Sequence, residues 1–416
     1  MAFKQSNLVP GWTDSDPVVN WKLYKKHIDD CVAQGSNTPQ LITYPVFSAD
    51  YGANYIKASN AYSGGVLVGD KIFFSPWNQS QNPYFAWHYL DLTSGKLKLY
   101  SIWTVNNPVA LAYQGAVVDQ NELVWFMPSE QGNQTKWHYV DPKKNWNGPD
   151  SIITVVNGPT KTNPYRGGVF VPSLNRIYLI PFNQSNEPTW HYIDTVTKTV
   201  VGYSQNSGVT PVANAYFGGV LAPNGRIYLI PYNQASASHW HYIDTNTGNV
   251  VAYPQNSGVT PVAASAYQGG ALTSNGKIYL APSQQADEAN WHYIDINTGS
   301  VVAYPNNSGV TPVSSVAYSG AIFAPDGYVY LIPYSQTTAT NWHRINPVDN
   351  SVSAYAVPAL IGSGSAVSGG VLAPDGRIYL MPCNGPISPS KLYCIKTNAQ
   401  QNFNTTVLTS PFFNKF

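Results

Sequence analysis

The chain has 416 residues, a formal net charge of +1 and only 10% charged residues, against 43% hydrophobic and 13% aromatic residues. A balanced charge without a basic cluster argues against nucleic-acid binding through phosphate neutralisation. No apolar run reaches the length of about 20 residues that a transmembrane helix needs, which argues against membrane insertion.

Residues 1–40 fall outside any repeat, and we expect them to form an N-terminal arm. The opening stretch, MAFKQSNLVPGW, lacks the apolar core of a signal peptide. Residues 18–32, VVNWKLYKKHIDDCV, are too apolar to be expected as a disordered, solvent-exposed segment. We therefore expect this arm to pack against a face of its own domain or against a neighbouring subunit.

After about residue 60, nearly the whole chain consists of a unit that recurs about every 51 residues. Each unit contains a Gly-Gly or Gly-Ala pair, and the seven pairs begin at Gly64, Gly115, Gly167, Gly218, Gly269, Gly320 and Gly369. A Trp-His pair follows in six units, at Trp87-His88, Trp137-His138, Trp190-His191, Trp240-His241, Trp291-His292 and Trp342-His343. The seventh unit has Leu392-Tyr393 in that place.

Each unit holds four runs typical of strands, which in the fourth unit read GGVLAP, RIYLIP, WHYIDT and NVVAYP. Tight-turn sequences such as PNG and TNTG separate them. Seven four-stranded units predict an all-β, seven-bladed β-propeller. A solenoid is the alternative, but it would need polar capping repeats, and the last unit, GGVLAPDGRIYLMP, is as apolar as the others.

The seventh unit ends after its third strand, KLYCIKT, so its fourth strand must come from elsewhere. Residues 41–45, LITYP, match the VVAYP of the other units and are the favoured candidate, while residues 407–411, VLTSP, compete for the place. The predicted organisation is an arm at 1–40, a propeller at 41–396 and a C-terminal arm at 397–416.

The repeated Trp-His pairs favour a structural role over a metal site. The third strand of a blade lies roughly 10 Å outside the innermost strand, so six histidines are spread around the ring, whereas zinc needs ligands at about 2 Å. The acidic residue that follows each pair is expected to bond backbone N–H groups of the next turn. These residues are Asp91, Asp141, Asp194, Asp244 and Asp295, with Asn346 in the sixth unit.

We expect no metal and no cofactor. The three cysteines, Cys31, Cys383 and Cys394, lack metal-binding spacing, and in the absence of a secretory signal they are predicted to be free thiols.

Loops alternate between the two faces of a propeller, and the long loops all fall on one face. They carry a repeated Pro-x-x-Gln, often with an aromatic residue after the proline, and such aromatic planes and amides suit neutral sugars. The candidate ligand-binding residues are Trp77, Gln79, Phe182, Gln184, Tyr232, Gln234, Gln285, Tyr334 and Gln336, and Gln131 shares the motif. The alternative is that each glutamine bonds its own loop and that the aromatic ring packs beneath it.

Catalysis needs an asymmetric group of acids, bases or nucleophiles, and the long loops offer few. The candidates scatter over four blades and are Glu130, Glu187, Asp287, Glu288 and His239. Neither a Ser-His-Asp arrangement nor a calcium cage can be read from the sequence. We therefore predict that the protein is not an enzyme.

The runs APDGRIYL and APNGRIYL resemble blade motifs of the seven-bladed propellers that include virginiamycin B lyase and the gluconolactonase-like enzymes. The glycine pair is also similar to that of kelch repeats, although here the apolar run follows the pair. The resemblance implies architecture only, because the catalytic His and Glu of the lyase cannot be placed on this sequence.

The sequence thus predicts a non-catalytic propeller that works by binding or assembly. Four Glu in the whole chain, with Asn, Gln, Ser, Thr and Tyr in place of charged residues, are typical of particle proteins. The favoured setting is therefore a viral or phage particle, reached from the cytoplasm without a signal peptide, with other subunits as partners. The alternatives are a propeller lectin for neutral glycans and a lyase- or lactonase-like enzyme.

Overall fold

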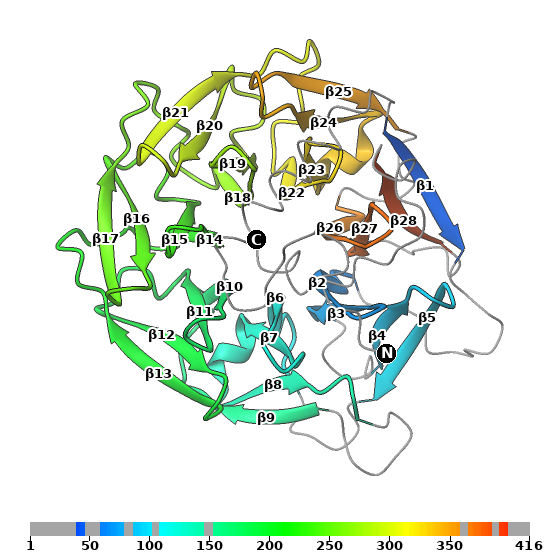
Figure 1. Cartoon of the computed structure of the whole chain (residues 1–416), viewed down its shortest axis with the longest axis vertical. Helices are drawn as coiled ribbons and strands as arrows, with labels where there is room; N and C mark the ends of the chain where they lie inside the picture. The colour runs from blue at the N-terminus through cyan, green and yellow to red at the C-terminus, as the bar shows by residue number, and fades with distance from the viewer. Residues whose placement is uncertain are drawn as a thin grey trace, which may run out of the picture.

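The computed structural model describes residues 39–45, 59–78, 86–101, 108–144, 153–357, 365–384 and 391–397. These residues form seven four-stranded antiparallel sheets arranged as a ring around a central axis (Figure 1). The protein is therefore a seven-bladed β-propeller, as its repeat predicts.

The first strand of each blade lies nearest the axis and the fourth lies at the rim (Figure 1). Blade 1 comprises β2 (Tyr62–Val68), β3 (Lys71–Pro76), β4 (Ala86–Asp91) and β5 (Lys96–Ser101). Blade 2 comprises β6 (Tyr113–Val118), β7 (Val124–Pro128), β8 (Lys136–Val140) and β9 (Ile153–Asn157). Blade 3 comprises β10 (Tyr165–Val171), β11 (Arg176–Pro181), β12 (Thr189–Asp194) and β13 (Thr199–Ser204).

Blades 4 to 7 repeat this order. Blade 4 comprises β14 (Tyr216–Leu221), β15 (Arg226–Pro231), β16 (His239–Asp244) and β17 (Asn249–Pro254), and blade 5 comprises β18 (Tyr267–Leu272), β19 (Lys277–Pro282), β20 (Asn290–Asp295) and β21 (Ser300–Pro305). Blade 6 comprises β22 (Tyr318–Phe323), β23 (Val329–Pro333), β24 (Asn341–Ile345) and β25 (Val352–Ala356). The first three strands of blade 7 are β26 (Val367–Leu372), β27 (Arg377–Pro382) and β28 (Lys391–Lys396). The loops between second and third strands include two short 3-10 helices, η3 (Glu130–Asn133) and η4 (Ser335–Thr338).

The seventh blade takes its outer strand from the N-terminal end of the chain. Strand β1 (Gln40–Pro45) pairs antiparallel with β28, with Leu41 opposite Ile395 and Tyr44 opposite Leu392. Two distant parts of the chain therefore close the ring, by the strand that the sequence favoured. The competing residues 407–411, and nearly all of both predicted arms, lie outside the described residues.

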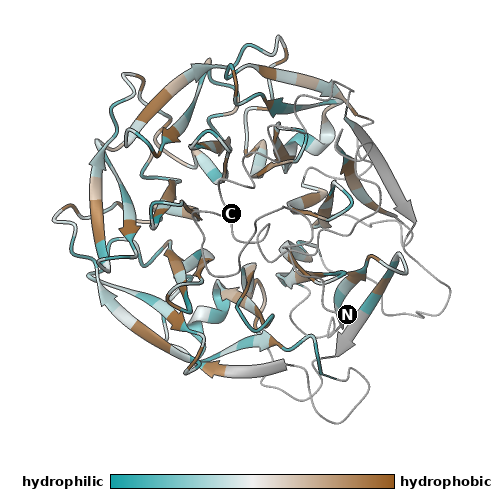
Figure 2. Cartoon of the chain, viewed as in Figure 1, coloured by the Kyte–Doolittle hydropathy of each residue, from teal (hydrophilic) through white to brown (hydrophobic). Residues whose placement is uncertain are grey.

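Side chains between neighbouring blades form the core. In one such layer Trp240 and Tyr253 of blade 4 pack with Tyr267 and Ile278 of blade 5, and all four are at most 7% exposed. Figure 2 shows hydrophobic residues along the strands and hydrophilic residues in many of the loops. Because the strands face another blade on each side, they exclude charge, which accounts for the low charged fraction.

The glycine pair at the start of each first strand allows the blades to approach closely near the axis. The first glycine of each pair has a positive φ, +85° at Gly218 for example, and the ladder shifts register between Tyr216 and Gly219. At Gly369, whose φ is +76°, a Cβ atom would lie only 2.8 Å from the Cα of Gly64 in blade 1. Glycine is thus required there both by conformation and by space.

Among the described residues, no helix has the length and apolar character needed to cross a bilayer.

Candidate binding site at the mouth of the central channel

In blades 4, 5 and 6 the repeated histidine, His241, His292 or His343, bonds the incoming long loop from inside the blade. In blade 4, Nδ1 of His241 lies 2.5 Å from the hydroxyl of Tyr216, and Nε2 lies 2.9 Å from the carbonyl of Val209 in the incoming long loop. A carbonyl only accepts, so Nε2 carries the proton and the tyrosine O–H donates to Nδ1. The ring is therefore neutral and both of its nitrogens are occupied.

The same Tyr–His contact recurs in six blades. The pairs are Tyr62–His88, Tyr113–His138, Tyr165–His191, Tyr216–His241, Tyr267–His292 and Tyr318–His343. Burial lowers the pKa of His241 to about 4, with a smaller contribution from the nearby His239 and opposition from the bond to Val209. The Trp-His motif is therefore a structural brace, which is the role that the sequence favoured.

The acidic residues after each Trp-His pair also act as expected. The carboxylate of Asp244 accepts the backbone N–H groups of Asn246 at 3.0 Å and Thr247 at 3.2 Å. Asn346 holds the equivalent turn in blade 6 by accepting the N–H of Val348 at 3.0 Å. Cys383 and Cys394 are buried free thiols, as predicted, and burial raises the pKa of each to about 12.

The Pro-x-x-Gln glutamines tie two long loops together. Gln234 is 2% exposed; its carbonyl accepts the N–H of Val212 at 2.8 Å and its amide donates to the carbonyl of His239 at 2.8 Å. The same two bonds recur at Gln131, Gln285 and Gln336, and the amide bond recurs at Gln184. These side chains thus serve the loop-bracing role that the sequence left open, while Gln79 lies outside the described residues.

The aromatic members of the predicted site are placed differently from the glutamines. Trp77, Phe182, Tyr232 and Tyr334 are half-buried residues at the starts of the long loops. The long-loop face therefore carries partly accessible aromatic residues on loops that the glutamine bonds hold in place.

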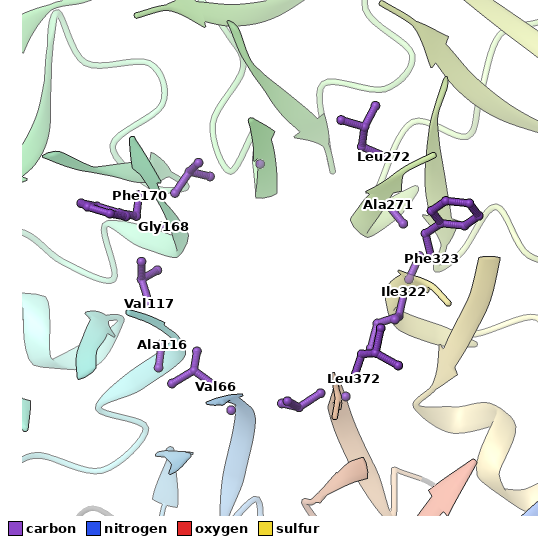
Figure 3. Close-up of a pocket in the computed structure, with 16 residues that line it drawn as sticks. Val66, Ala116, Val117, Gly168, Phe170, Ala271, Leu272, Ile322, Phe323 and Leu372 are labelled. Atoms are coloured by element: carbon purple, nitrogen blue, oxygen red, sulfur yellow. The ribbon is translucent and has the colours of Figure 1, made fainter. Parts of the chain in front are cut away.

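The channel itself contains a cavity of about 230 Å³ on the axis (Figure 3). Its wall is formed by the ends of the first strands, including Val66, Val117, Phe170, Leu272 and Leu372. Sixteen lining residues are all glycine or apolar. None of these described lining residues therefore supplies an acid, a base or a nucleophile.

A different set of side chains lies where the first strands begin, on the long-loop side of the glycine pairs. We call the residues immediately before the first glycines the mouth ring: Ser63, Gln114, Arg166, Phe217, Gln268, Ser319 and Ser368. The flanking Tyr and Gly positions barely change from blade to blade, whereas this position holds four chemically different side chains, Ser, Gln, Arg and Phe. The repeat therefore loses its symmetry at this position.

Arg166 is the only charged member of the mouth ring, and it is held by two blades. Its Nη1 donates to the Gln114 carbonyl oxygen and to the Ser129 hydroxyl of blade 2. Its guanidinium carbon lies 4.7 Å from the ring centroid of Phe182. Burial lowers the pKa of Arg166 to about 10, although Glu130 and Tyr232 oppose that shift.

Aromatic rings continue from Arg166 into blade 4. The ring of Tyr232 lies 5.7 Å from that of Phe182 and 5.8 Å from that of Phe217, measured between centroids. Within the part of the chain that the structure describes, no carboxylate forms an ion pair with Arg166. The mouth of the channel thus combines a half-buried cation with adjacent aromatic surface.

The Pro-x-x-Gln motif predicts Phe182 and Tyr232, but it does not point to Arg166, Gln114 or Phe217. The available signal for these three was the variation of the residue between a nearly constant Tyr and a constant Gly. The charged groups considered for catalysis do not gather there, and in the described ranges no three His, Cys, Asp or Glu side chains come together as a metal-binding group. Of those candidates, Glu130 is the one that contributes to the electrostatics of Arg166.

No protein-family model matches this sequence, and no curated protein is detectably similar to it. Among solved structures, the chain is similar to the extracellular domain of a protein described as a hybrid two-component system from B. thetaiotaomicron, with 13% identity and a TM-score of 0.57 over 86% of this chain and 41% of that one. It is also similar to a fungal alcohol oxidase of the AA5 family in complex with copper, with 12% identity and a TM-score of 0.53 over 86% of this chain and 76% of that one. At such identities the likeness shows the propeller fold alone, and this chain spans less than half the length of the first of these proteins.

Proposed function

We propose that this chain is a non-catalytic binding propeller that holds its ligand on the long-loop face, at the mouth ring. One observation carries the proposal. The bonds that build the scaffold recur from blade to blade, whereas the mouth ring differs and gathers Arg166 beside the rings of Phe182, Phe217 and Tyr232. Rigid scaffolds commonly carry their function on such loop ends.

A non-catalytic role is supported by how the polar groups are used. His241 is neutral and occupied at both nitrogens, and Gln234 is occupied at both ends of its amide. The half-buried aromatic rings remain as contact surface, which serves binding without supplying an acid, base or nucleophile.

A role as a component of a viral or phage particle stays a prediction from composition, and a propeller lectin for neutral glycans stays the alternative. The particle role is tested by cross-linking and mass measurement on the native protein, together with a check for co-purification with particles. Recovery as a free monomer from cells that produce such particles would contradict it.

The binding proposal is tested with Tyr232→Ala on a panel of neutral and acidic oligosaccharides. We expect a loss of about fivefold to tenfold in affinity, because stacking on the half-buried ring contributes about 1–1.4 kcal/mol. The matched control is Tyr242→Ala, which removes another half-buried tyrosine, one that Arg226 covers at 4.5 Å on a different part of blade 4. Equal binding by both variants, or binding by neither them nor the wild type, would contradict the proposal.

A further inference from the structure

We propose that Arg166 forms a carboxylate-binding subsite, so that the ligand of the long-loop face is an acidic sugar of the uronic acid type. This inference rests on the proposed function and specifies the chemistry of its ligand. It depends on how the guanidinium is held, which of its donors are used, and what surrounds it.

The guanidinium is fixed in place before any ligand arrives. Gln114 and Ser129 of blade 2 accept from Nη1, and Phe182 of its own blade covers one face at 4.7 Å. A side chain already held in one orientation loses little conformational entropy on binding. Arg166 is therefore preorganised in a way that an ordinary surface arginine is not.

Three of its five N–H donors remain for a ligand. The bonds to Gln114 and Ser129 both use Nη1, and no residue in the described ranges accepts a hydrogen bond from Nε or Nη2 of Arg166. The Nε–Nη2 edge is the side of a guanidinium that matches the two oxygens of a carboxylate. The contacts with the protein thus leave open the edge that recognises a planar anion.

The fold itself does not require a charge at this position. In other blades neutral mouth-ring residues make the contact between blades: the Ser63 hydroxyl donates to the carbonyl of Tyr113 at 2.8 Å, and the Ser319 hydroxyl accepts from the N–H of Gly369 at 3.3 Å. Replacing such a residue with a half-buried cation adds a desolvation cost that a tie between blades does not need. A binding role explains why the charge is there.

The charge around Arg166 is incompletely balanced. Glu130 is near enough to stabilise the cation but forms no ion pair with it, and its carboxylate is bonded to the amide of Asn133 at 2.9 Å. An incoming carboxylate would supply the missing counter-charge in a partly desolvated position, where the attraction is stronger than in water.

The aromatic surface beside Arg166 indicates a ligand with a ring. Tyr232 lies within 5.8 Å of both Phe182 and Phe217, so apolar surface continues directly from the cation into blade 4. A pyranose ring can stack its C–H face on an aromatic ring while an acid group on the same sugar reaches the arginine. A uronic acid satisfies both requirements with one residue.

The test compares trigalacturonate with the neutral trimer of galactose by calorimetry on the full-length protein. We expect the wild type to bind the acidic trimer at least about tenfold more tightly than the neutral one, and Arg166→Gln to bind the two trimers with equal affinity. Arg166→Lys should keep only part of the preference, because an ammonium lacks the planar fork. Arg226→Gln, at an arginine next to a tight turn on the opposite face, is the control and should retain the full preference.

The outcomes separate this inference from the proposed function. Loss of neutral binding in Tyr232→Ala without any acid preference in the wild type would overturn the carboxylate subsite and leave the binding site standing. A preference that Arg166→Gln preserves would also overturn it, as would equal or tighter binding of a sulfated galactose trimer. If neither trimer binds, and no other oligosaccharide binds in a way that depends on Tyr232, both proposals fail.

Discussion

Acidification should destabilise the propeller through its braced histidines, and His241 allows the size of the effect to be calculated. The pKa of His241 is about 4 in the folded chain, against 6.5 for an ordinary histidine, as in the unfolded chain. Between these values the unfolded chain binds a proton that the folded chain does not. The free energy of unfolding therefore falls as the pH drops from about 6.5 towards 4, and the contribution of His241 is complete above that window.

The magnitude follows from the two pKa values. At pH 4 the unfolded chain is almost fully protonated at this position and the folded chain is half protonated, which costs about 3 kcal/mol relative to pH 7. The side chain is 0% exposed, so solvent screening does not reduce this figure much. His191, His292 and His343 shift in the same direction because burial disfavours their charged forms.

The matched variant is His241→Gln, whose amide can donate to Val209 and accept from Tyr216 without titrating. Urea unfolding of both proteins at pH 7, 5 and 4 isolates the histidine, because every other titrating group is common to the two. We expect the wild type to lose about 3 kcal/mol more than the variant between pH 7 and pH 4. Parallel pH profiles would refute the buried, neutral brace.

Three further changes test the closure of the ring, the close approach of the blades and the bracing of the loops. Deletion of residues 1–46 removes β1 and should abolish cooperative unfolding, and a truncated chain that melts like the full one would contradict the observed closure. Gly369→Ala should cost about 1–2 kcal/mol more than Gly258→Ala in urea unfolding, since both glycines have positive φ but only at Gly369 would the added Cβ atom meet backbone, 2.8 Å from the Cα of Gly64. Gln234→Ala should cost about 1–3 kcal/mol in the same assay by leaving buried loop groups unpaired, and an unchanged midpoint would refute its bracing role.

The sequence predicts the blades well and the mouth ring poorly, for physical reasons. A strand, a tight turn or an Asp-bonded turn is specified within a few neighbouring residues, so seven copies of one pattern reveal the architecture. The group around Arg166 joins Gln114 of blade 2 to Tyr232 of blade 4, and such contacts depend on how the blades stack. The sequence also left open whether Gln234 braces its loops or contacts a ligand. The structure distinguishes the two roles, because the Gln234 side chain is buried and hydrogen-bonded to a neighbouring loop.

The closing strand has a consequence for how the protein is made. Residues 40–45 leave the ribosome early, but their partner Lys391 follows only about 350 residues later, roughly 20–70 s at ordinary elongation rates. Blades 1 to 6 can stack as they emerge, yet they remain an open arc, with one face of blade 1 and one face of blade 6 uncovered, until blade 7 fills the gap. A circular permutant that begins at blade 1 and carries β1 directly after β28 would build its last blade from consecutive strands. The last blade could then form as soon as its strands leave the ribosome, because β1 would be synthesised directly after its partner β28.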